Sequence, residues 1–168
     1  MPADIVEEQG LCSNCGPAEL VTSLAQRKAA VIARKLAATK CEPTIVIGCD
    51  TVAECGGQIL GKPVDEADAR RILTALSDRR HRVYSGLCVW PIPDGLPLVR
   101  CDVTTLQMQP LAPEQLDAYL ATHLWEGKAG AFGYQDGLDW VRIEEGSESN
   151  VVGLPLELLA EMLAQATG

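Results

Sequence analysis

Two long strand-like segments flank a turn in the middle of the chain, and this arrangement limits the fold more than any other feature. Residues 81–92 (HRVYSGLCVWPI) and 97–109 (PLVRCDVTTLQMQ) are rich in β-branched, aromatic and aliphatic side chains. Asp94-Gly95 between them is a strong hairpin signal. Because helical patterns occur before and after this hairpin, the sheet must accept both hairpin and helical connections. The sequence therefore predicts an α/β or α+β fold with a mixed sheet.

The rest of the chain alternates between helix and strand patterns. Residues 17–40 predict a long helix with proline in its first turn, and 44–49 (TIVIGC) predict a short buried strand. The glycine pair at 56–57 predicts that residues 51–60 form a small hairpin. Further predictions are helices at 65–76, from 113 onward and at 156–166, a strand at 138–143, and irregular or loop structure at 125–137 and 146–150.

Composition and charge narrow the class of protein. With 168 residues and neither repeats nor linkers, residues 1–168 are predicted to form a single domain. No stretch approaches ~20 consecutive apolar residues, the start is acidic rather than signal-like, and the seven cysteines are scattered. We therefore expect a cytoplasmic protein with reduced thiols and no membrane contact. The net charge of -9 argues against nucleic-acid binding, but a small anionic ligand could bind local lysines and a divalent cation.

Asp50 is the strongest candidate for chemistry, because it directly follows the predicted strand at 44–49. Open α/β sheets bind ligands at the carboxyl ends of their strands, where an acid can meet a metal or a substrate. The structural alternative is a helix cap or an Asx turn, although the following Thr-Val-Ala does not resemble a helix start. Asp50 and Glu7, together with a phosphate chain, would supply the hard oxygen ligands that Mg²⁺ prefers.

Two lysines are candidate anion-binding residues. Lys28 projects roughly 80° from Leu20, within the apolar stripe of the first helix. A charged group there must be paired, extend its amine to solvent, or meet an anion, and Lys35 in the same sector favours extension to solvent. Lys62 precedes Pro63, which holds it in an extended conformation.

The glycine-rich segment AGAFGY is flanked by Lys128 and Gln135, and its glycines would let the backbone approach a ligand closely. The sequence contains neither a P-loop nor a GxGxxG dinucleotide motif. Cys12 and Cys15 precede a helix, but the other cysteines are too dispersed to predict a zinc site, and no strand precedes the pair as in a redox motif.

Seven short motifs, in this order, resemble the Maf family of nucleoside triphosphate pyrophosphatases. They are ADIVE (3–7), LAQRKA (24–29), GCDTV (48–52), ILGKP (59–63), LSDRRHRVYSG (76–86), KAGAFGYQ (128–135) and GSESNVVGLPLE (146–157). The resemblance implies an elongated, two-lobed α/β fold with a mixed sheet and flanking helices, like that of inosine triphosphate pyrophosphatases. It also implies a cytoplasmic enzyme, a possible homodimer, and a need for a divalent metal cation, Mg or Mn.

The same resemblance implies hydrolysis between the α and β phosphates of a nucleoside triphosphate, giving the monophosphate and pyrophosphate. By motif, Asp50 and Glu7 would be the catalytic and metal-binding acids. Lys28 and Lys62 would bind phosphate, and Gln135 would contact the substrate near the reacting region. These roles agree with the chemistry, because cations must offset the charges of a triphosphate.

Two questions about activity stay open at this stage. GCDT and KAGAFGYQ resemble the subgroup acting on dTTP and UTP, and the alternative is 7-methyl-GTP or another modified nucleotide. Family members normally also carry a Ser-x-Ser-Pro-Arg-Arg loop before ADIVE, and this sequence has none. We therefore expect lower stability and turnover than in a chain carrying that loop. The alternative in another class is a catalytically impaired nucleotide-binding regulator.

Overall fold

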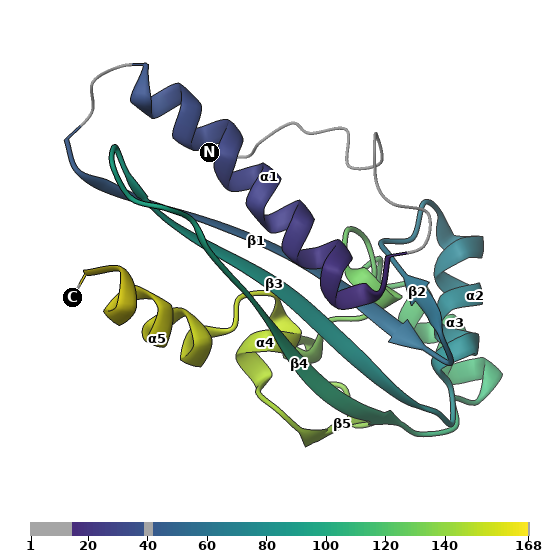
Figure 1. The fold of residues 1–168 in the computed structure, drawn as a ribbon. Helices are drawn as coiled ribbons and strands as arrows, with labels where there is room; N and C mark the ends of the chain where they lie inside the picture. The colour runs from purple at the N-terminus through teal and green to yellow at the C-terminus, as the bar shows by residue number, and fades with distance from the viewer. Residues whose placement is uncertain (1–14, 39–41, 168) are drawn as a thin grey trace. The chain divides into compact units, whose positions relative to one another are not determined.

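The computed structural model describes residues 15–38 and 42–167, and these form two compact units. The first unit contains the described residues up to Asp50, together with Ser85–Asp102 and the chain from Gly153 onward. The second unit contains Thr51–Tyr84 and Val103–Val152. The order of elements can be followed by colour in Figure 1. Within the described ranges, none of the helices combines the length and apolar character that crossing a membrane would require.

The first unit is a three-stranded portion of sheet between two helices. Its strands are neighbours in the order β1-β3-β4. Side chains alternate between the two faces of a strand, so Leu87 and Val89 pack with Met162, whereas Cys88 packs with Ala29 on the other face. The elements of this unit are α1 (Pro17–Ala37), α5 (Leu156–Thr167), and parts of β1 (Thr44–Cys55), β3 (Arg80–Ile92) and β4 (Leu98–Met108).

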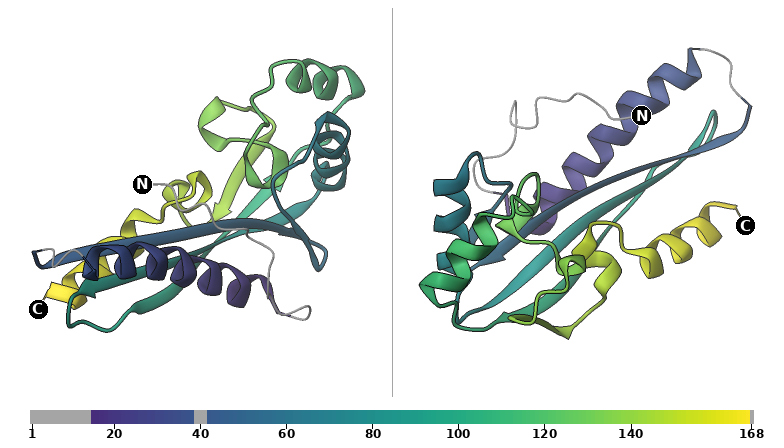
Figure 2. Two further views of the ribbon diagram at one scale, coloured as in Figure 1. Left: turned by 90° about the horizontal axis from the view of Figure 1, so that it is seen from above. Right: turned by 180° about the vertical axis from the view of Figure 1, so that it is seen from behind.

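Helix α1 lies beside β1 in both views of Figure 2, and glycine makes this approach possible. A Cβ atom added to Gly48 of β1 would lie 2.3 Å from the carbonyl oxygen of Ala25. One added to Gly86 of the neighbouring strand β3 would lie 2.2 Å from the carbonyl oxygen of Val21, so α1 approaches β3 as closely. The buried face of α1 therefore consists largely of small residues, and of the predicted apolar stripe only Val21 and Leu24 are fully buried. The alanines on this face are Ala25, Ala29 and Ala33.

The second unit contains β2, β5 and the remaining parts of β1, β3 and β4, with helices packed around a larger core. In the complete sheet the strand order is β2-β1-β3-β4-β5. Ala53 pairs with Leu60 in the antiparallel β1-β2 hairpin, and Met108 pairs with Val141 in the antiparallel β4-β5 pair. Its other elements are β2 (Gln58–Leu60), α2 (Glu66–Leu76), α3 (Pro113–Leu120), η1 (Ala129–Ala131), η2 (Tyr134–Asp136), β5 (Val141–Glu145) and α4 (Glu148–Val152).

Most predicted elements are confirmed, including the hairpin at 51–60 and the α/β class with helices flanking the sheet. The central hairpin is also confirmed, since Gly95 closes it by donating its N–H to the carbonyl of Pro91 at 3.1 Å. The predicted start of the second helix is confirmed too, because the Asp65 carboxylate accepts the N–H of Asp68 at 2.8 Å.

Three local predictions are wrong. The short strand predicted at 44–49 does not end before Asp50, because it continues into the hairpin as one strand, β1, so Asp50 lies inside the strand rather than after its carboxyl end. The strand predicted at 138–143 is shifted and occupies Val141–Glu145. The polar stretch predicted as a loop at 146–150 instead leads into α4. Ser147 accepts the N–H of Asn150, as a helix cap does, and the buried Asn150 amide donates to Thr104 Oγ1 at 2.9 Å. These tertiary bonds stabilise a short helix that the polar composition does not reveal.

Candidate functional site

An ion pair joins the two strongest candidates of the first unit. Lys28 on α1 donates from Nζ to Oδ1 of Asp50, the last residue of β1 within this unit. The pair is mostly shielded from solvent, with side-chain exposures of 23% for Lys28 and 11% for Asp50. Lys35, in the same helical sector, is exposed. Lys28 is therefore partnered rather than extended into solvent.

The backbone explains why these two side chains meet. Gly48 lies two residues before Asp50 and against Ala25, so β1 and α1 approach one another at this level of the helix. Lys28 lies three residues after Ala25 and so projects from the same side of α1. A carboxylate can accept several hydrogen bonds, so pairing with Lys28 does not by itself prevent Asp50 from binding a metal.

Lys62 and the glycine-rich loop are linked in the second unit. Lys62 is exposed and follows β2 by two residues. The N–H of Gly130 donates to the carbonyl oxygen of Gly61 at 3.1 Å, and η1 packs against α2. The backbone beside Lys62 is therefore bonded to the loop that carries Gln135. Asp50 and Lys62 belong to different units, so their approach stays a prediction.

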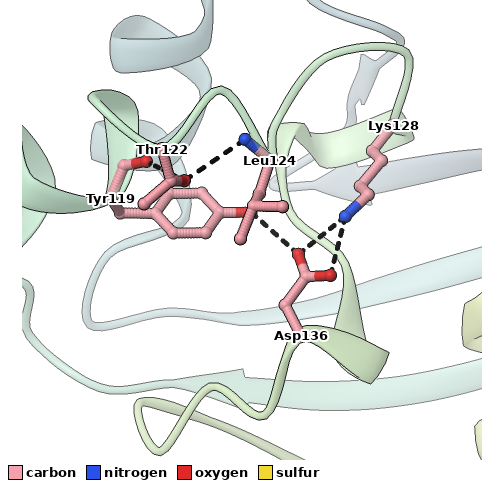
Figure 3. A network of polar contacts seen from close by, with 5 residues as sticks. All are labelled: Tyr119, Thr122, Leu124, Lys128 and Asp136. Atoms are coloured by element: carbon pink, nitrogen blue, oxygen red, sulfur yellow. Dashed lines mark hydrogen bonds and ion pairs between the residues drawn. The ribbon is translucent and has the colours of Figure 1, made fainter.

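A second, mostly buried ion pair closes the glycine-rich loop (Figure 3). Nζ of Lys128 lies 2.8 Å from Oδ1 and 2.7 Å from Oδ2 of Asp136, and the Tyr119 hydroxyl donates to Oδ2 at 3.3 Å. Gln135 is exposed and directly precedes Asp136. Sequence reasoning noted Lys128 but missed Asp136 and Tyr119. The available signal was an acid eight residues after Lys128, at the other end of the glycine run.

His81 is a buried histidine in the core of the second unit. Its side chain is 2% exposed, its ring packs edge-on against Phe132, and its Nε2 has no hydrogen-bond partner among the described residues. Burial lowers the pKa of His81 to about 4, so the ring is neutral at pH 7. These surroundings are typical of a histidine in the core rather than of a general base.

The metal-binding prediction is only partly within the described residues. Glu7 lies outside them, as does Cys12. In the part of the chain that the structure describes, no three His, Cys, Asp or Glu side chains gather into a metal-binding group. Mg²⁺ often uses only one or two carboxylates together with substrate phosphates, so Asp50 still has suitable donor chemistry. Among the described cysteines, Cys55, Cys88 and Cys101 are free thiols.

Comparison with known proteins resolves the family. The family model described as "Maf-like protein" matches residues 1–166. The chain belongs to the Maf-like family. This Maf-like chain is 46% identical over 163 residues to a dTTP/UTP pyrophosphatase of Rhodopirellula baltica, covering 96% of this chain and 70% of that protein.

Two further relatives agree. A dTTP/UTP pyrophosphatase of Geobacter sulfurreducens is 43% identical, covering 83% of this chain and 71% of the relative. A dTTP/UTP pyrophosphatase of Dictyoglomus turgidum is 38% identical, covering 94% of this chain and 80% of the relative. The family expected from the seven motifs is therefore confirmed.

Proposed function

We propose that this Maf-like protein is a nucleoside triphosphate pyrophosphatase that acts on dTTP or UTP. It would cleave the bond between the α and β phosphates, with water supplying the oxygen and protons that complete the monophosphate and pyrophosphate. Relatives named dTTP/UTP pyrophosphatase align with most of the chain and support this proposal. The observation that carries it is the shielded Lys28–Asp50 pair, which joins a cation and an acid where the sequence motifs predict them.

Each candidate residue has a role that its chemistry suits. Asp50 and Glu7 are proposed as the catalytic acids. Lys28 and Lys62 would neutralise phosphate charge, which grows on the leaving pyrophosphate as the bond breaks. Lys28 also orients Asp50 through their ion pair. Gln135, exposed on its loop, would contact the substrate near the reacting phosphate.

We also propose a divalent cation, Mg or Mn, as cofactor. Asp50 and Glu7 would hold it, since both offer the hard carboxylate oxygens that these ions prefer. When bound, such an ion neutralises phosphate charge and lowers the pKa of water. Lys28 then has the further task of keeping the Asp50 carboxylate oriented before substrate and ion arrive.

The proposal is tested by incubating the protein with a nucleotide panel and Mg²⁺ or Mn²⁺, while pyrophosphate release is followed. We expect turnover of dTTP or UTP, and a loss of at least about 100-fold in Asp50→Asn. Glu161→Gln is the matched control, because Glu161 forms an exposed ion pair with Arg100 in the same unit. Its activity should equal that of the wild type.

The other outcomes separate the alternatives. A preference for 7-methyl-GTP or another modified nucleotide would change the substrate but keep the reaction. Nucleotide binding without pyrophosphate release would instead indicate a nucleotide-binding regulator. We further propose a cytoplasmic homodimer. Fractionation of the producing cells and light scattering of the purified protein test these two points.

A further inference from the structure

We propose that Asp136 is a positioning residue that holds Gln135 in place for the substrate, by anchoring the glycine-rich loop to Lys128 and Tyr119. This inference rests on the proposed function and assigns no direct contact between Asp136 and substrate. Its observations come from the second unit alone, where all four residues lie.

The anchor begins with the position of Asp136. Its side chain is 8% exposed and contacts Nζ of Lys128 through both carboxylate oxygens, at 2.8 and 2.7 Å. Lys128 precedes η1, and Asp136 is the last residue of η2, so the pair joins the two ends of the loop. A shielded ion pair with two short contacts defines position better than an exposed one.

Tyr119 ties this pair to the core. Its ring packs edge-on against Trp140, and the residue is 7% exposed. The hydroxyl donates to Oδ2 of Asp136 at 3.3 Å. Burial, together with the neighbouring Asp136 charge, raises the pKa of Tyr119 well above its usual value, so the hydroxyl keeps its proton and remains a donor. The carboxylate is thus held from α3 as well as from the start of the loop.

The loop backbone needs such an anchor. It contains only two three-residue 3₁₀ helices, and Gly130 and Gly137 have positive φ angles of 73° and 72°. Gly133 leaves space for the ion pair. A Cβ atom there would lie 2.5 Å from Nζ of Lys128 and 2.7 Å from Oδ2 of Asp136. The glycine at position 133 therefore leaves room for the Lys128–Asp136 ion pair, which a larger residue there would crowd.

Gln135 is the residue that this arrangement controls. It is exposed, lies in the same 3₁₀ turn as Asp136, and directly precedes it. Fixing the Asp136 side chain therefore fixes the backbone from which Gln135 projects. Lys128 itself is a weaker candidate for phosphate binding, since its charge is already balanced by Asp136. Displacing a contacting group by about 1 Å can reduce turnover ~100-fold. Loss of the contacts that hold Asp136 would therefore reduce turnover by moving Gln135.

The test is a double-mutant cycle between Asp136→Asn and Gln135→Ala, with kcat and KM measured for dTTP or UTP. We expect Asp136→Asn to lower kcat by about 10-fold to 100-fold while KM changes by less than about threefold. In the Gln135→Ala protein the same substitution should cause no further loss of kcat. Full multiplication of the two losses, or an unchanged kcat in Asp136→Asn, would overturn the inference.

Three further variants separate positioning from folding. Asp117→Asn removes an exposed ion pair with Arg70 in the same unit and should leave kcat unchanged. Gly133→Ala changes no charge but crowds the pair, and it should reproduce the loss of kcat. If Asp136→Asn does not fold, Lys128→Met/Asp136→Asn leaves no buried charge unpaired and takes its place in the cycle. A wild type that hydrolyses no nucleotide would overturn the proposed function and this inference together, whereas an active wild type with an unaffected Asp136→Asn overturns only the inference.

Discussion

Gly48 of β1 lies so close to Ala25 of α1 that a Cβ atom on the glycine would be 2.3 Å from the alanine carbonyl oxygen. The neighbour is backbone, which cannot move aside as a flexible side chain can. This contact brings β1, the strand that carries Asp50, against the helix that carries Lys28. The ion pair between them therefore depends on a residue with no functional group of its own.

The first prediction concerns this contact. Gly48→Ala should lower the free energy of unfolding by about 1–3 kcal/mol, since the added methyl group must push α1 away from β1. Urea denaturation followed by circular dichroism measures the change. Gly61→Ala is the matched control, because nothing lies within 4 Å of a Cβ atom there and its φ angle is not positive. Equal stability of the Gly48 and Gly61 variants would contradict the packing argument.

The second prediction compares two lysines of α1. Lys28→Ala should lower kcat/KM for the nucleotide by about 100-fold, because it removes both a phosphate-binding cation and the partner of Asp50. Lys35→Ala, one heptad later and exposed, should change kcat/KM by less than about twofold. Steady-state kinetics on the two purified variants measures both changes in kcat/KM. Similar losses in both would show that Lys28 has no special role.

The third prediction is a pH dependence of stability from His81. Its pKa is lowered from 6.5 to about 4 by burial, an effect that Glu54 and the Arg79 carbonyl partly oppose. Between these values the unfolded chain binds a proton that the folded chain does not. Stability should therefore fall as the pH falls from 6.5 to about 4, by about 3 kcal/mol from this residue.

Denaturant titrations at several pH values test the His81 effect by comparing the wild type with His81→Leu. Carboxylates titrate in the same range in both proteins, so the difference between the two curves isolates the histidine. The wild type should lose more stability than His81→Leu below pH 6.5. Parallel curves would mean that His81 binds its proton as readily in the folded protein as in the unfolded chain.

The fourth prediction concerns the buried amide of Asn150. Asn150 donates to Thr104 Oγ1 at 2.9 Å and to the carbonyl of Val83 at 3.3 Å. Asn150→Ala should cost about 1–3 kcal/mol of stability, because buried partners lose a hydrogen bond. A double-mutant cycle with Thr104→Val should give a coupling of about 1 kcal/mol. A coupling near zero would mean that the Asn150–Thr104 bond contributes nothing.

Much of the local structure follows from the sequence. The Asp94-Gly95 signal, the glycine pair at 56–57 and the capping Asp65 each predict an element that the structure confirms. These signals are local, because the dihedral angles and caps they require involve residues only a few positions apart. The predictions at 146–150 and 138–143 are wrong because the structure of these segments depends on residues far away in the sequence. Asn150 is helical through bonds to β3 and β4, and the position of β5 is set by pairing with β4.

The sequence by itself determined the family, through seven motifs in order, and the α/β class, through periodicity and turn signals. It also marked Lys28, Asp50, Lys62 and Gln135 as candidates. Only the tertiary structure decided that Lys28 contacts Asp50, that Gly48 permits this, and that Lys128 pairs with Asp136 rather than standing as a separate cation. Such pairings depend on distances between elements, which are set by packing, whereas periodicity and propensity report only on the chain's immediate neighbours.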